Sequence, residues 1–165
     1  KPVLYVCNVD EASASSGNDY SNAIDELAQS EEAVSIVISA EIESELSQLE
    51  ESDKQEYMDE LGVKESGLNS MIRSGYELLD LMTYFTAGPN ESRAWTVQNG
   101  STAPEAAGVI HTDFEHGFIR AEVIPYQEYV RLGGEQKCKE AGKMRVEGKE
   151  YIVRDGDVIY FRFNV

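Results

Sequence analysis

Two short apolar runs, each followed by polar residues, constrain the fold of this chain more than any other feature. VLYVC (3–7) ends abruptly in NVDE (8–11), and VSIVIS spans residues 34–39. Continuous apolar runs of this length are typical of strands buried on both faces of a parallel sheet. Residues 19–30 between them, and residues 41–50 after them, place apolar side chains at helical spacing. The pattern therefore predicts a β-α-β-α unit.

This unit needs further neighbours, because two parallel strands alone cannot bury both faces. The sequence from Ser52 to Gly62 predicts a short helix with a capping box at its start and a glycine at its end. Next comes an apolar stripe at helical spacing, which is more often core than a docking groove, so we expect it to be buried. Its residues are Leu68, Met71, Ile72, Tyr76 and Leu79.

From Leu81 the spacing changes from helical to alternating. LMTYFTAG (81–88) and SRAWTVQNG (92–100) predict paired strands joined around residues 88–90. TAPE (102–105) predicts the capped start of a helix that runs to about Ile110. The remaining signals predict a strand at FIRAEVI (118–124), a helical turn at PYQEYVRLGG (125–134) and, in YIVRDGDVIYFRFNV (151–165), two strands joined by a tight turn at Arg154–Asp157. This is an α+β order, compatible with a small sheet that grasps one helix, and we place a domain boundary near residue 81.

The net charge of −17 is unevenly distributed along the chain. Residues 1–80 carry 4 basic and 19 acidic side chains, whereas residues 131–165 carry 8 basic and 6 acidic ones. The acidic part would repel phosphates, which argues against DNA binding and leaves only the last part to meet a polyanion. Residues 132–149 there are predicted to form an exposed, glycine-punctuated loop, which is either a solvated surface or a docking patch for RNA or protein. Its candidate contacts are Lys137, Lys139, Lys143, Arg145 and Lys149.

Neither a membrane span nor a secretory leader is visible, since no apolar run approaches about 20 residues. Cys7 and Cys138 lie far apart, which is no disulfide framework and suits a reducing cytosol. We therefore expect a cytoplasmic protein without membrane contact. The chain has no initiator Met and runs straight into a strand, so we also expect that an amino-terminal part is missing.

The sequence offers little for catalysis. A Walker A loop requires Gly, four residues and then Gly-Lys-Ser/Thr. Gly142-Lys143 is followed by Met144, and Gly148-Lys149 is followed by Glu150, so neither fits. Two histidines and two carboxylates in HTDFEH (111–116) are a weak zinc signal without further ligands, and no nucleophile elbow is present. We expect no catalytic residues, no metal site and no phosphoryl transfer by this chain alone.

The runs KPVLYVCNVDE, GVIHTDFEHGFIRAEV and EAGKMRVEGKEYIVRDGDVIYFRFNV resemble the YchF family of Obg-like ATPases along essentially the whole chain. The resemblance implies that residues 1–80 are the carboxy-terminal part of a P-loop nucleotide-binding domain with a helical connector. It implies that residues 81–165 are a TGS domain, a ubiquitin-like β-grasp fold. The full-length parent would bind ATP or GTP with Mg²⁺ and act as a nucleoside-triphosphate hydrolase on the ribosome, whereas this part would hold no nucleotide by itself.

The resemblance also implies a base-reading site at Asn8, Val9, Glu11, Ser39 and Ala40. GTPases carry Asn-Lys-x-Asp, in which the Asp accepts from guanine. Here Val9 replaces the Lys and Glu11 replaces the Asp, which weakens selection of guanine and agrees with the family's preference for ATP. The alternative for Asn8 is a turn-forming residue after a strand.

For the second domain, the resemblance implies contact with the ribosome or ribosomal RNA. If the basic loop is only a solvated surface, the contact is expected on the sheet around Arg93, Trp95 and Arg120. The alternative function is a β-grasp module that binds proteins and not RNA.

Overall fold

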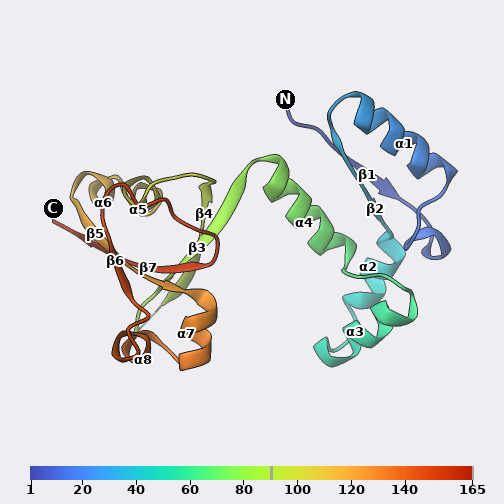
Figure 1. Ribbon diagram of the computed structural model, residues 1–165. Coiled ribbons are helices and arrows are strands. Elements are labelled where there is room, and N and C mark those ends of the chain that lie inside the picture. Colours follow the sequence, from blue (N-terminus) through green and yellow to red (C-terminus); the bar gives the residue numbers. More distant parts are fainter. Residues whose placement is uncertain (90, 165) are drawn as a thin grey trace. The chain divides into compact units, whose positions relative to one another are not determined.

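The computed structural model describes residues 1–89 and 91–164 (Figure 1). They divide into two compact units, Lys1–Leu79 (unit 1) and Asp80–Val165 (unit 2). Within the described residues, no helix is both long and apolar enough to span a bilayer. Asn90, in the predicted turn between two strands, lies outside the described residues.

Unit 1 contains the predicted β-α-β-α order. Strands β1 (Leu4–Asn8) and β2 (Val34–Ile38) pair in parallel, with Asn8 opposite Ile38. Helix α1 (Asp19–Ser30) connects the two strands and has the predicted bounds. Parallel strands need a long crossover connection, which this helix provides. Helix α2 (Ala40–Leu46) follows β2 and is shorter than predicted. The expectation that both strands are buried on both faces is wrong: β1 and β2 are half-buried, and Val6 is 42% exposed.

Two further expectations for unit 1 are wrong. Helix α3 (Glu51–Glu60) forms without a capping box, because the Ser52 hydroxyl donates to the neighbouring side chain of Asp53. Helix α4 (Gly67–Leu78) buries its apolar stripe only in part: Leu68 and Ile72 are each about half exposed, whereas Met71 and Tyr76 are partly buried.

The small residues of α4 explain this orientation. Gly67 and Ser74 are the buried residues of the helix. A Cβ at Gly67 would lie 2.8 Å from Ile38, so the glycine allows the helix to approach β2 closely. Leu68 and Ile72, which lie outside this buried face, remain about half exposed.

Unit 2 is a five-stranded sheet in the order β4-β3-β7-β5-β6. Strand β3 pairs in parallel with β7, and the other neighbours are antiparallel. The strands are β3 (Leu81–Ala87), β4 (Ser92–Gln98), β5 (Phe118–Pro125), β6 (Arg145–Glu147) and β7 (Asp157–Phe163). The helices are α5 (Ala103–Ile110), α6 (Thr112–His116), α7 (Tyr126–Leu132) and α8 (Glu135–Glu140).

Helices α5 and α6 lie on one side of this sheet, and α7 and α8 lie on the other (Figure 1). On the α5 side, the buried hydroxyl of Tyr84 donates to the carbonyl of Ala106 at 2.8 Å. Helix α5 begins as predicted, since the Glu105 carboxylate accepts from the Thr102 N–H at 2.7 Å. The mixed α+β order predicted for the chain is confirmed.

Residues 132–149 are not the exposed loop that we expected. They contain α8 and β6, and Cys138 of α8 is fully buried. Its side chain belongs to the apolar cluster on the α7 side, together with Ile124 and Val158. A six-residue helix that buries one side chain has no visible apolar period, which is why the sequence pattern indicates a loop.

A buried carboxylate fixes the turn before β7. Asp157 is 3% exposed, and its Oδ2 accepts from the Tyr151 hydroxyl at 2.7 Å and from the Arg154 N–H at 3.0 Å. Arg145 in turn donates to the Tyr151 hydroxyl at 3.0 Å. Burial, with the hydrogen bond to Asp157, raises the pKa of Tyr151 to about 12. The predicted tight turn at Arg154–Asp157 is confirmed, with the Asp157 N–H bonded to the Arg154 carbonyl. The strand predicted before this turn does not form, because Ile152 makes only an isolated bridge with Thr102.

We predict that Asp157→Ala lowers the free energy of unfolding by about 2–4 kcal/mol, because it leaves buried donors unpaired. Asp113→Ala, at an exposed position, is the control and should change it by less than about 0.5 kcal/mol. Urea titration followed by the fluorescence of Trp95, the one tryptophan of the chain, measures the effect in unit 2. Equal stability losses in the two variants would contradict the role of Asp157.

Candidate functional site

The carboxyl ends of β1 and β2 bring four of the predicted base-binding residues together. The Asn8 side-chain oxygen accepts from the Ala40 N–H at 2.9 Å, and the Val9 N–H donates to the Ile38 carbonyl at 2.9 Å. Ser39 lies between these two contacts. Polar groups at this end of a parallel sheet lie where open α/β folds bind ligands.

The hydrogen bond to Ala40 determines which group of the Asn8 side-chain amide can still bind a ligand. Because Oδ1 is used by Ala40, the Nδ2 group is the part that can donate to an acceptor on a base. Asn8 is exposed, as such a contact requires. The bond joins the end of β1 to the start of α2, 32 residues further along the chain, so Asn8 does more than form a local turn.

Glu11, the fifth predicted residue, is exposed at the start of the short 3-10 helix Glu11–Ser13. Its surroundings are negatively charged. The pKa of Tyr57 is raised to about 12, mainly by a hydrogen bond to Glu45. The negative charges of Glu11 and Glu41 raise this pKa further. This region therefore suits a neutral base with N–H donors better than a phosphate.

Ser39 lies in a second environment that the sequence did not indicate. The residue is 3% exposed, and its hydroxyl has no hydrogen-bond partner among the described residues. It lines a cleft of about 270 Å³ together with Ser15, Glu43 and Gly67. A buried hydroxyl normally has a hydrogen-bond partner, so the environment of Ser39 is unusual.

The histidines and carboxylates of the described residues do not build a metal centre. Within residues 1–89 and 91–164, no three His, Cys, Asp or Glu side chains converge as a metal site. His111 caps α6, since its Nδ1 accepts from the Asp113 N–H at 3.1 Å.

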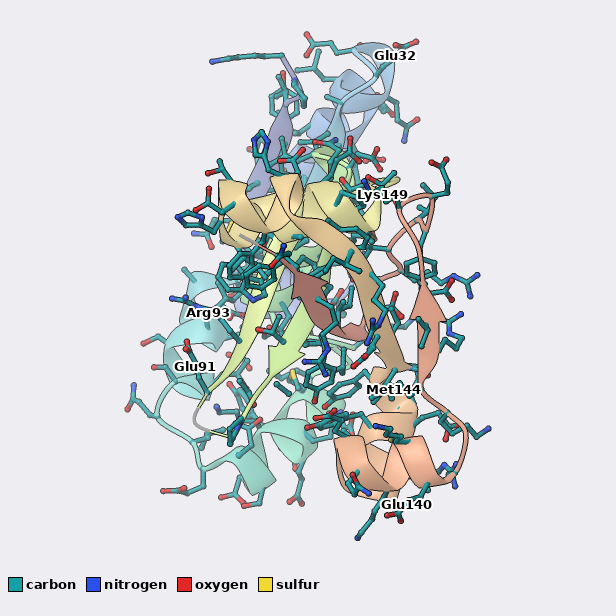
Figure 2. The ribbon with its side chains drawn as sticks, turned by 90° about the vertical axis from the view of Figure 1, so that its left-hand side faces the viewer. Glu32, Glu91, Arg93, Glu140, Met144 and Lys149 are labelled. Carbon is teal, nitrogen blue, oxygen red and sulfur yellow. The ribbon has the colours of Figure 1, made fainter. Side chains whose placement is uncertain are left out.

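The candidate basic residues of unit 2 do not form one patch. Lys137 and Lys139 lie on α8, whereas Lys149 follows β6. Figure 2 shows Lys149 at the opposite end of unit 2 from Glu140, the last residue of α8. Arg145 lies 5.5 Å from the centre of the Tyr151 ring and belongs to the Asp157 network, so it is no freely exposed cation.

The alternative contact surface, on the sheet around Arg93, Trp95 and Arg120, is split between the two faces of the sheet. Trp95 packs against the core on the α5 side, where Arg93 lies over its ring at 4.8 Å. Arg120 lies on the other face, where it and Arg162 both donate to Glu122. The hydrogen bond from Arg162 is the main cause that lowers the pKa of Glu122. Arg93 and Trp95 therefore do not share a surface with Arg120.

A groove in unit 2 has no counterpart in the sequence analysis. Its volume is about 650 Å³, and its lining includes Phe85, Tyr126, Lys143 and Arg154. These residues come from β3, α7, the turn after α8 and the turn before β7. No spacing in the sequence links them, so only the tertiary structure reveals the groove.

We predict that Asn8→Ala speeds hydrogen exchange of the Ala40 amide, because its acceptor is lost. Asn8→Asp is the matched control, since a carboxylate retains the acceptor. A lost hydrogen bond of about 1 kcal/mol corresponds to roughly fivefold faster exchange, measurable by NMR. If Ala40 exchanges equally fast in both variants and in the unchanged chain, Asn8 does not hold the two loops together.

Comparisons with known proteins agree on one family. Residues 81–164 match the family model YchF-GTPase_C, described as a protein of unknown function (DUF933). The whole chain is 55% identical over 165 residues to the ribosome-binding ATPase YchF of Haemophilus influenzae, and 56% identical over 167 residues to that of Bacillus subtilis. The chain spans 45% and 46% of the length of these two relatives.

Two solved structures are also similar. The YchF GTPase of Schizosaccharomyces pombe matches 98% of this chain and 43% of its own, with a TM-score of 0.81 and 37% identity. A GTP binding protein of Pyrococcus horikoshii matches 99% of this chain and 46% of its own, with a TM-score of 0.66. Its identity of 19% supports a likeness of fold alone.

Proposed function

The chain belongs to the YchF family, and we propose that it serves a ribosome-binding ATPase by reading the nucleotide base and contacting the ribosome. The observation that carries this proposal is the bond between Asn8 and Ala40, which fixes a polar side chain at the end of a parallel strand pair. The similarity to relatives named ribosome-binding ATPase, over the whole chain, supports the second part.

In this proposal, unit 1 is the carboxy-terminal part of a P-loop nucleotide-binding domain with its helical connector. The half-buried strands β1 and β2 support it, because their faces and edges are suited to further strands and helices. Residues outside this chain would hold the phosphates and Mg²⁺ of ATP or GTP. The chain alone would be catalytically silent, and its protein cytoplasmic.

Unit 2 would be the TGS domain, with a β-grasp arrangement. The packing of α5 against one face of the mixed sheet supports this assignment. Its role would be contact with ribosomal RNA, because it contains most of the basic residues of the chain. Lys137 and Lys139, both exposed on α8, would supply phosphate contacts.

The base-reading role predicts a change in nucleotide choice. In full-length Haemophilus influenzae YchF with its matched region replaced by this chain, Val9→Lys with Glu11→Asp should shift relative affinity towards GTP. One good contact to a base edge discriminates by about 1–3 kcal/mol, so the shift should be roughly five- to a hundredfold. Competition of ATP and GTP for a fluorescent nucleotide measures it. Unchanged relative affinities would show that these residues do not read the base.

The ribosome contact predicts a salt-dependent interaction. The chain should co-sediment with ribosomes, and Lys137→Glu with Lys139→Glu should weaken this binding. Two lost phosphate contacts should also flatten the log–log salt dependence by about 1.4–1.8. Lys1→Glu with Lys64→Glu makes the same charge change in unit 1 and should have little effect.

Three results would count against the proposal. Absence of co-sedimentation at low salt contradicts ribosome binding by this chain. Equal effects of the two double variants would show that only net charge matters. Binding that ignores salt would indicate a protein partner instead of RNA.

A further inference from the structure

The groove in unit 2 has rigid walls. The Gly156 N–H donates to the Thr83 carbonyl at 2.8 Å, and the Tyr126 N–H donates to the Gly156 carbonyl at 3.0 Å. In addition, the Asp155 carboxylate accepts from the Thr83 N–H at 2.9 Å. The turn that carries Arg154 is therefore fixed to the strand and to the helix that form the other walls.

One wall of the groove is aromatic. Tyr126 is 50% exposed, and its ring packs on Phe85 with the centroids 5.5 Å apart. A ring that is braced by a neighbour and still open to solvent is a ready platform for stacking. Stacking on such rings tolerates every base, because each base has a flat π-face.

Among the described cations that line the groove, Arg154 is the least engaged, and Lys143 is paired with Glu128 only at long distance. Within the described part of unit 2, no side-chain hydrogen bond or ion pair engages the Arg154 guanidinium, and only its backbone N–H is used. Lys143 lies 3.8 Å from Glu128, a carboxylate that Arg131 already binds. The hydrogen bond from Arg131 is the main cause that lowers the pKa of Glu128.

The acidic side chains of the groove are largely used within the fold. Asp155 binds Thr83, and Asp157 binds Tyr151 and the turn. Glu128 also lines the groove and is paired with Arg131 and Lys143, and Arg145 lies 3.9 Å from Asp157. Neighbouring cations therefore offset part of the negative charge that an incoming phosphate would meet. The remaining lone pairs of Asp155 and Asp157 can accept from amino groups, which bases possess and phosphates do not.

We propose that this groove binds a nucleotide of single-stranded RNA, with the base stacked on Tyr126 and the phosphodiester held by Arg154 and Lys143. The inference rests on the proposed ribosome contact and assigns it a site. The volume of about 650 Å³ lies within the range of about 300–1,000 Å³ that is usual for ligand pockets. An acidic peptide fits less well, because it offers the groove carboxylates few donors.

The test is the binding of a fluorescein-labelled single-stranded RNA octamer to the whole chain, followed by anisotropy at several salt concentrations. Tyr126→Leu should weaken binding by about tenfold, and Tyr126→Phe should preserve it, because the ring does the stacking. Arg154→Gln should weaken binding and reduce the salt slope by about 0.7, whereas Arg154→Lys keeps the slope. Tyr20→Leu, at an 85% exposed position in unit 1, is the control and should bind as the unchanged chain does.

Several outcomes would overturn the groove assignment. They are equal binding by Tyr126→Leu and Tyr126→Phe, an unchanged salt slope in Arg154→Gln, and displacement of the RNA by a glutamate octapeptide or by inorganic phosphate at the same ionic strength. If Trp95 fluorescence shows that Tyr126→Leu is unfolded, the comparison of Arg154→Gln with Arg154→Lys, at an exposed position, tests the groove assignment by itself. Co-sedimentation with ribosomes that the groove variants leave intact would reject the groove and retain the proposed function. RNA binding at the groove without ribosome binding would retain the groove assignment and reject the proposed ribosome contact.

Discussion

One buried carboxylate organises the part of unit 2 on which its candidate function depends. Asp157 starts β7, holds the Tyr151 hydroxyl and closes the turn that carries Arg154. Through Tyr151 it also positions Arg145 on β6. A charged group is costly to bury unless it is paired, so this network requires all its members together. The walls of the groove are fixed because the turn is fixed.

Local signals predicted much of the fold. Helix α1 and the capped start of α5 at Thr102 depend on residues close in sequence, so both could be predicted. Burial depends on distant partners and was predicted less well. The apolar stripe of α4 is only partly buried because Gly67 brings another face of the helix against β2. Helix α8 was missed because Cys138 is its single buried residue.

The candidate sites, like the fold, combine features set by residues close in sequence with features set by distant segments. The family resemblance grouped Asn8 with Ala40, and the parallel register of β1 and β2 is what places Asn8 beside the start of α2. The basic residues looked like one patch because they are close in sequence, yet a helix and a strand separate Lys137 from Lys149. The groove joins segments of unit 2 that only the sheet order brings together.

The central claim is that unit 2 contacts the ribosome through Lys137 and Lys139 of α8 and through its groove. Hydrogen exchange of the chain, measured by mass spectrometry with and without ribosomes, tests it most directly. The account predicts slower exchange on ribosomes at residues 126–128, 137–145 and 154–156, with α1 unchanged. Protection confined to unit 1, or no protection in unit 2 under conditions where the chain is bound, would contradict it.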